Sequence, residues 1–232
     1  NRALHSLGPG RLRNALEQTN RDLGRTPDVV FLHNPEQTLA QLDQAHAREC
    51  LIQAGTVLVN AVKEGLCASW GIASWRPEPL LDLIDGATPK PDVLMVRSGL
   101  LVGPETLDAA ESLVERWNMP PSAVWGMSPF GGTTTDPVWD RFNPCVFLRP
   151  DTANEWSPIQ AAFRTAYHLP RVASVAVGTD DPAHLRELAD ALRAQVDQSA
   201  IDRYRSLLRS HREDINSSSN RRASARTGPS PT

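Results

Sequence analysis

The sequence predicts an α/β protein built around a parallel β-sheet. Short runs of β-branched and apolar residues alternate with longer stretches in which apolar residues recur at helical spacing. The connections between these segments are short, and such alternation implies parallel strands joined by right-handed crossovers. The pattern alone leaves open whether the sheet is an open doubly wound one or part of a barrel.

The first half of the chain supplies three predicted strands and the helices between them. An amphipathic helix begins at Pro9 and ends before Gly24, and a second long helix covers residues 45–64. The remaining predicted elements of this half are strands over 28–33, 67–74 and 92–101, and helices over 79–84 and 104–117.

The second half continues the alternation and then changes character. A strand is predicted over 123–128, followed by an irregular loop over 130–154, a helix over 157–168, a strand over 172–177, and helices from about 182 and over 200–210. Residues 1–210 are therefore expected to form one domain. Residues 211–232 are rich in Ser, Arg and Pro, and a disordered tail is expected there because few apolar residues offset the ordering entropy.

Composition excludes several classes of function. The chain has 232 residues and a formal net charge of −3, so no general attraction to nucleic acid or to an anionic membrane is expected. No apolar run is long enough to cross a bilayer, and a cytoplasmic location is the default expectation. The three cysteines are widely spaced and show no metal-ligand spacing, so no metal site is expected.

Five motifs, in order along the chain, resemble those of the aldo-keto reductase superfamily. They are His5-Ser6-Leu7 with the helix after it, Leu32-His33-Asn34-Pro35-Glu36, Trp70-Gly71-Ile72-Ala73-Ser74-Trp75, Met127-Ser128-Pro129-Phe130-Gly131-Gly132, and Val175-Ala176-Val177-Gly178-Thr179 with His184-Leu185-Arg186-Glu187. The resemblance implies an incomplete (β/α)₈ barrel of the TIM type, in which the five predicted strands are the fourth to the eighth. The first three strand–helix units are expected to be missing from this chain, which begins with Asn rather than Met.

The resemblance also implies a reaction, the transfer of a hydride from NADPH or NADH to a small-molecule carbonyl substrate. In this family a Tyr donates the proton, a Lys and an Asp tune that Tyr, and a His orients the substrate oxygen. Only the His has a counterpart here, His33, which could donate a hydrogen bond to a carbonyl oxygen. The two tyrosines, Tyr167 and Tyr204, lie on predicted helices and match no family motif.

The family's cofactor-binding positions are changed in this chain. The carboxamide of the nicotinamide would meet Ala73 and Ser74, with Met95 in place of a Gln, and the ring would meet Met127 beside Ser128. The remaining positions that the resemblance assigns to the cofactor are Gly178, Thr179, His184 and Glu187. The free N–H groups of a helix start suit a phosphate there, although Asp180 and Asp181 oppose it by charge.

Each of these positions also has a purely structural interpretation. His33 could be a polar residue at the rim of a sheet, Met95 and Met127 could be core residues, and the segment 178–182 could be an ordinary capped helix start. Two functions therefore stay open, an aldo-keto reductase type oxidoreductase and a catalytically inactive binding or regulatory module. A partial barrel would leave unpaired edges, so self-association or a covering partner is expected.

Overall fold

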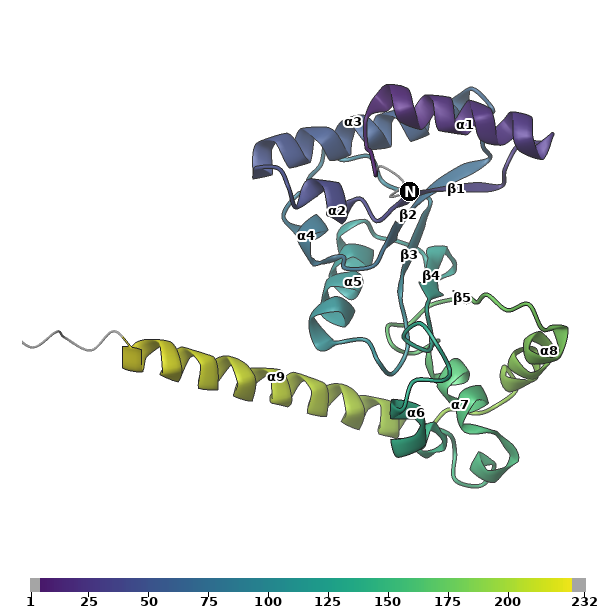
Figure 1. Cartoon of the computed structure of the whole chain (residues 1–232), viewed down its shortest axis with the longest axis vertical. Helices are drawn as coiled ribbons and strands as arrows, with labels where there is room; N and C mark the ends of the chain where they lie inside the picture. Colours follow the sequence, from purple (N-terminus) through teal and green to yellow (C-terminus); the bar gives the residue numbers. More distant parts are fainter. Residues whose placement is uncertain (1–4, 227–232) are drawn as a thin grey trace, which may run out of the picture.

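The computed structural model describes residues 5–226, with side chains described to residue 212. Five strands form one sheet in the order β1-β2-β3-β4-β5, and all neighbouring pairs are parallel. The strands are β1 Val29–His33, β2 Ser69–Ser74, β3 Val93–Arg97, β4 Val124–Met127 and β5 Ser174–Ala176 (Figure 1).

The strand order decides between the two architectures that the sequence leaves open. In an open doubly wound sheet the strand order reverses at one point, whereas here each strand pairs with the next one along the chain. Consecutive parallel pairing in one direction is the arrangement of a (β/α)₈ barrel. The predicted fold class, a partial barrel with five parallel strands, is confirmed.

Most of the predicted helices are present with different ends, and α2 (Glu36–Leu39) is a short helix that was not predicted. Their bounds are α1 Pro9–Leu23, α2 Glu36–Leu39, α3 Gln44–Lys63, α4 Glu78–Leu81, α5 Pro104–Arg116, α6 Val138–Arg141, α7 Pro158–Thr165, α8 Pro182–Ala191 and α9 Gln198–Arg226. The segment expected to be an irregular loop contains α6 and two short 3₁₀ helices, Pro144–Phe147 and Ala153–Glu155. Among the helices of the described residues, none is long and apolar enough to cross a membrane.

The last helix continues well past residue 210, where the sequence predicts its end. It projects away from the sheet as one continuous helix (Figure 1). The domain boundary at residue 210 and the disordered tail stay predictions, and residues 227–232 of that tail lie outside the described residues.

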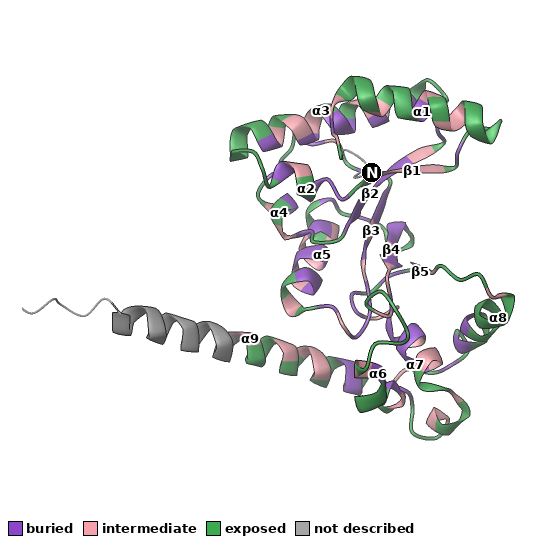
Figure 2. Cartoon of the chain, viewed as in Figure 1, coloured by how far each residue is buried: buried purple, intermediate pink, exposed green. Residues whose placement is uncertain are grey.

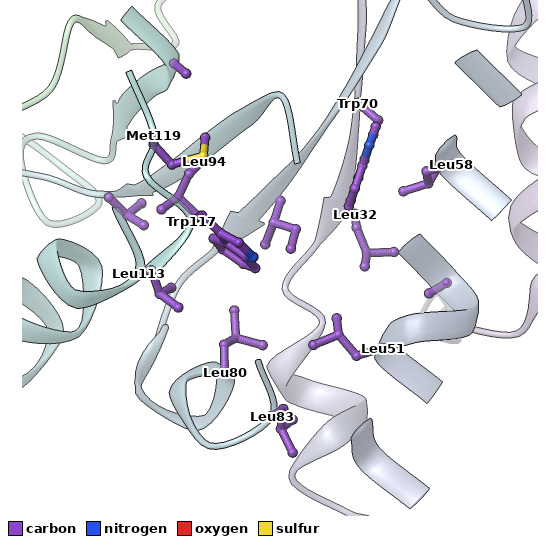
Figure 3. Packing of buried hydrophobic residues seen from close by; sticks show 14 of the residues in the cluster. Leu32, Leu51, Leu58, Trp70, Leu80, Leu83, Leu94, Leu113, Trp117 and Met119 are labelled. Carbon is purple, nitrogen blue, oxygen red and sulfur yellow. The ribbon is translucent and has the colours of Figure 1, made fainter. Parts of the chain in front are cut away.

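The main core lies between the sheet and the helices that follow its strands. Leu32, Ile72 and Leu94 point from the strands towards Leu51 and Leu113 on α3 and α5, and each of these side chains is buried. Figure 3 shows these leucines converging from the two layers, and Figure 2 shows the buried residues concentrated along β2 and β3. This apolar contact is the main source of the free energy that holds the helices on the sheet.

A second core joins the C-terminal helices to the loop after β3. Leu100, Phe147 and Ile201 are buried together, and Tyr204 packs edge-on against Phe147 with ring centroids 5.3 Å apart. The Tyr204 hydroxyl donates to the backbone oxygen of Leu100 at 2.5 Å. Tyr204 therefore holds α9 against this second core and does not lie at the carboxyl ends of the strands.

The inner face of the sheet, which would line the barrel, carries aromatic residues over a glycine. The Phe31 and Trp125 rings lie 5.8 Å apart, and Phe31 covers Gly71 on the neighbouring strand. A Cβ atom at residue 71 would lie 2.6 Å from the backbone oxygen of Val93 and 2.7 Å from Phe31 Cε1. Only glycine at residue 71 allows Phe31 to pack this closely against β2.

We predict that Gly71→Ala lowers the free energy of unfolding by about 1–3 kcal/mol, because the added methyl group must displace Phe31 or the β3 backbone. Gly86→Ala is the matched control, since a Cβ at residue 86 meets nothing within 4 Å. Urea denaturation followed by tryptophan emission measures both changes. Equal stability of the two variants would contradict the close packing on the inner face.

Candidate functional site

The carboxyl ends of the five parallel strands form one rim of the sheet, and the register decides which residues share it. His33, Ala73, Met95, Trp125 and Ser174 lie in one row across all five strands. Because side chains alternate along a strand, these residues face the same side of the sheet. The register therefore brings His33 and Met95 onto a single inner surface.

A second row lies two residues closer to the rim. Arg97, Met127 and Ala176 are register partners on β3, β4 and β5. They face the same side as the first row, so Met127 belongs to the surface that also carries His33 and Met95. Ser128 follows at the start of a turn, with a φ of 54° and its backbone oxygen accepting from Gly131 N.

Ser74 lies on the opposite side of the sheet from Ala73. Its register partner is Val96, a core residue of the helix-facing layer. The Ser74 side chain is fully buried, and its Oγ has no hydrogen-bond partner within the described part of the chain. Contact between Ser74 and a ligand at the inner surface would require the rim to rearrange.

His33 is exposed at the end of β1, with its backbone fixed in place. The backbone oxygen of His33 accepts from His5 Nε2 at 2.5 Å, and His5 Nδ1 lies 2.7 Å from Thr38 Oγ1. His33 is exposed, and its imidazole has no hydrogen-bond partner among the described residues.

The residues after His33 tie the ends of β1 and β2 together. Glu36 is 4% exposed, and its Oε1 accepts from the backbone N–H groups of Trp75 at 2.9 Å and Arg76 at 3.1 Å. Asn34, in the left-handed region with a φ of 46°, also accepts from Trp75 N at 3.0 Å. The Asn-Pro-Glu part of the motif therefore shapes the rim, a role that sequence reasoning did not assign to Glu36.

Arg97 is the second group that sequence reasoning missed. Its guanidinium carbon lies 4.7 Å from the centre of the Trp75 ring, and its Nη2 donates to Leu101 O at 3.4 Å. Burial lowers the pKa of Arg97, and the charge of the nearby Glu78 acts in the opposite direction. Nothing in the one-letter pattern distinguishes this arginine, because its position depends on the pairing of β3 with β2 and β4.

The positions at which the resemblance implies phosphate binding lie at the start of α8. Side chains of the same segment cap this end of the helix. Asp181 accepts from Ala183 N at 2.8 Å, and Thr179 Oγ1 accepts from Asp181 N at 3.1 Å. His184 Nε2 lies 3.7 Å from the Asp181 carboxylate. Gly178 and Glu187 are exposed beside it. A carboxylate thus already occupies the place that a phosphate would take.

Known structures share this arrangement of strands and helices. An aldo/keto reductase from Brucella melitensis matches with a TM-score of 0.59 and 17% identity, over 86% of this chain and 68% of that one. An aldose reductase from Giardia lamblia matches with a TM-score of 0.61 and 18% identity, over 89% and 70%. The chain has the aldo-keto reductase fold.

A further match with this fold is a variant of Gox0644 in complex with NADPH, with a TM-score of 0.58 and 19% identity. It covers 86% of this chain and 66% of that one, so the chain spans about two thirds of the length of such structures. No family model and no curated protein matches the sequence. Within residues 5–226, no group of three or more His, Cys, Asp or Glu side chains could hold a metal ion.

We predict that Glu36→Ala lowers the free energy of unfolding by about 1–3 kcal/mol, because the backbone N–H of Arg76 loses the acceptor that the buried Glu36 provides. Glu36→Gln should cost less, since the amide oxygen can still accept. The matched control is Glu115→Ala on the exposed side of α5. Urea denaturation gives the free energies, and a loss no larger than that of the control would show that Glu36 does not hold the rim.

Proposed function

We propose that the protein is an aldo-keto reductase type oxidoreductase that reduces a small-molecule carbonyl substrate with NADPH or NADH. The observation that carries this proposal is the shared rim, where His33 and Met127 face one inner surface at the carboxyl ends of the strands. Ligands of barrel enzymes bind at this rim. The cytoplasm stays the proposed location.

In this proposal His33 orients the substrate. Its exposed imidazole stands at the rim of β1 and can donate a hydrogen bond to a carbonyl oxygen as negative charge develops on it. The proton donor has to come from elsewhere, because Tyr204 is held by Leu100 and Tyr167 lies beyond α7. We therefore propose that the active protein includes strand–helix units that pair with the free edge of β1.

The residues present fit the nicotinamide cofactor poorly. The inner surface offers Ala73, Met95 and Met127, which can pack against a ring but give its carboxamide no hydrogen bonds. Ser74 faces the core, and Asp181 already caps α8. The residues of this chain therefore suit the orientation of a carbonyl group better than the tight binding of a cofactor.

This poor fit favours a second candidate, a catalytically inactive binding or regulatory module of the same fold. The rim, the exposed His33 and the aromatic inner face would then serve ligand binding alone. The two functions differ in a single measurable property, the binding of a nicotinamide dinucleotide.

We predict that NADPH or NADH quenches the tryptophan emission of the protein, because Trp75 and Trp125 lie at the rim and on the inner face. Titration with each cofactor measures the effect. No change at millimolar cofactor would contradict the oxidoreductase and favour the binding module.

The variant His33→Ala tests whether His33 acts in carbonyl reduction or only in ligand binding. In a protein that includes the proposed additional strand–helix units, the oxidoreductase proposal expects this variant to keep the cofactor-dependent quench and to lose most carbonyl reduction, roughly 10²-fold or more. The matched control is His211→Ala on the exposed surface of α9. Unchanged reduction in the His33 variant would remove His33 from the mechanism.

We also propose that the free edge of β1 associates with another chain segment. Beside this strand lies an apolar cavity of about 120 Å³ that is lined by Leu12, Ala15, Leu16, Thr19, Val30, Phe31, Leu32 and Leu58. An unpaired strand next to an apolar hollow favours pairing with a second chain. Sedimentation of the 232-residue chain is expected to show oligomers, and a stable monomer across micromolar concentrations would contradict this proposal.

A further inference from the structure

Arg97 occupies a distinctive position at the rim. It is the last residue of β3, and its register partner Met127 belongs to the proposed ligand surface. His33 lies two strands away and one row deeper, which places the two Cα atoms about 12 Å apart at the usual strand spacing and rise. A small molecule that bridges this distance could therefore contact both side chains.

The hydrogen-bond donors of the Arg97 guanidinium are only partly used within the protein. Its Nε is buried without a hydrogen-bond partner among the described residues, and its Nη2 makes a single long bond to Leu101 O. The nearest opposing charge that acts on it is Glu78, whose Oε1 already accepts from Thr106 Oγ1 at 2.5 Å. The described residues place no carboxylate within 4.0 Å of it.

Other arginines of the described chain differ from Arg97 in this respect. Nine of them form ion pairs with Asp or Glu: Arg13, Arg25, Arg48, Arg149, Arg193, Arg203, Arg205, Arg209 and Arg212. Burial also lowers the pKa of Arg164, but that residue lies on α7 and donates to Ala194 O at 2.9 Å. Arg97 alone combines partial burial, an unused donor and a place at the carboxyl end of a strand.

Such a guanidinium is suited to bind an anion. A partly desolvated cation without a counter-ion is costly, and an oxyanion ligand would remove that cost. The Nε of Arg97 is buried, so a ligand would meet the two Nη groups, which can form two parallel hydrogen bonds with a carboxylate. Stacking on Trp75 holds the plane of the guanidinium in one orientation. The stack therefore prepares the group for binding before a ligand arrives.

We propose that Arg97 binds the carboxylate of the ligand, so that the substrate class is a carbonyl compound that also carries a carboxylate. The inference rests on the proposed function for the carbonyl group, whereas the anion site itself would also serve a binding module. The carbonyl would lie towards His33 and the carboxylate towards Arg97.

The test compares two probes that differ only in charge, 4-carboxybenzaldehyde and its neutral amide, 4-carbamoylbenzaldehyde. Isothermal titration calorimetry of the full chain is expected to show about tenfold tighter binding of the carboxylate probe, the size expected for a charge-assisted hydrogen bond. Arg97→Met should bind both probes equally. Arg97→Lys should keep part of the preference, because it retains the charge but loses the fork.

Arg76→Met is the matched control, because Arg76 is an exposed arginine at the same rim. It should keep the full preference for the carboxylate probe. Thermal unfolding of each variant checks that it is folded, and Arg97→Lys preserves the size of the side chain if Arg97→Met unfolds. Equal binding of the two probes by the unchanged protein, or a preference that survives Arg97→Met, would overturn the proposal.

A further arm separates a substrate carboxylate from a cofactor phosphate. The carboxylate probe is titrated with and without saturating NADPH. Competitive displacement would assign Arg97 to the cofactor and overturn the substrate assignment, and unchanged binding supports it. A protein that ignores NADPH but still prefers the carboxylate probe would refute the oxidoreductase proposal and leave the anion site standing.

Discussion

The structure depends on the parallel pairing of each strand with the next one along the chain. This pairing sends every crossover in the same direction, so the helices collect on one face and the carboxyl ends of all strands meet at one rim. The helix-facing side is filled by leucines such as Leu51 and Leu113, and it is the main source of stability. The opposite face and the rim are thereby left for residues with other roles.

The different roles of the two faces explain where the residues that could contact a ligand lie. Residues at even positions of β2, such as Ile72 and Ser74, are committed to the core, whereas Gly71 and Ala73 face inward. The inner face is mostly apolar and aromatic, and among its described residues His33 and Arg97 are the titratable groups at the rim. A ligand at this rim would be oriented by these two side chains, with Trp75 and Glu36 holding the rim in shape.

The elements of the fold could be predicted from the sequence because each strand is a short apolar run and each long helix has an apolar face. The ends of elements were less predictable. α9 continues past Ser210 although its sequence becomes polar there, because local helical hydrogen bonding does not require an apolar face. At the rim, motif order placed His33 and Met127, but Glu36 and Arg97 act through residues on neighbouring strands, and that information resides in the register.

The charges at the rim are arranged differently from those expected of a dinucleotide site. A helix start that binds phosphate needs free N–H groups and a positive field. Asp180 and Asp181 precede α8, and Asp181 fills the capping position. The positive charge is two strands away, on Arg97. Arg97 and His33 face the same inner surface of the sheet. The positive charge that suits an anion therefore lies nearer to His33, the proposed carbonyl-binding residue, than to α8. This distribution suits an acidic ligand held on the inner surface, whether it is reduced there or only bound.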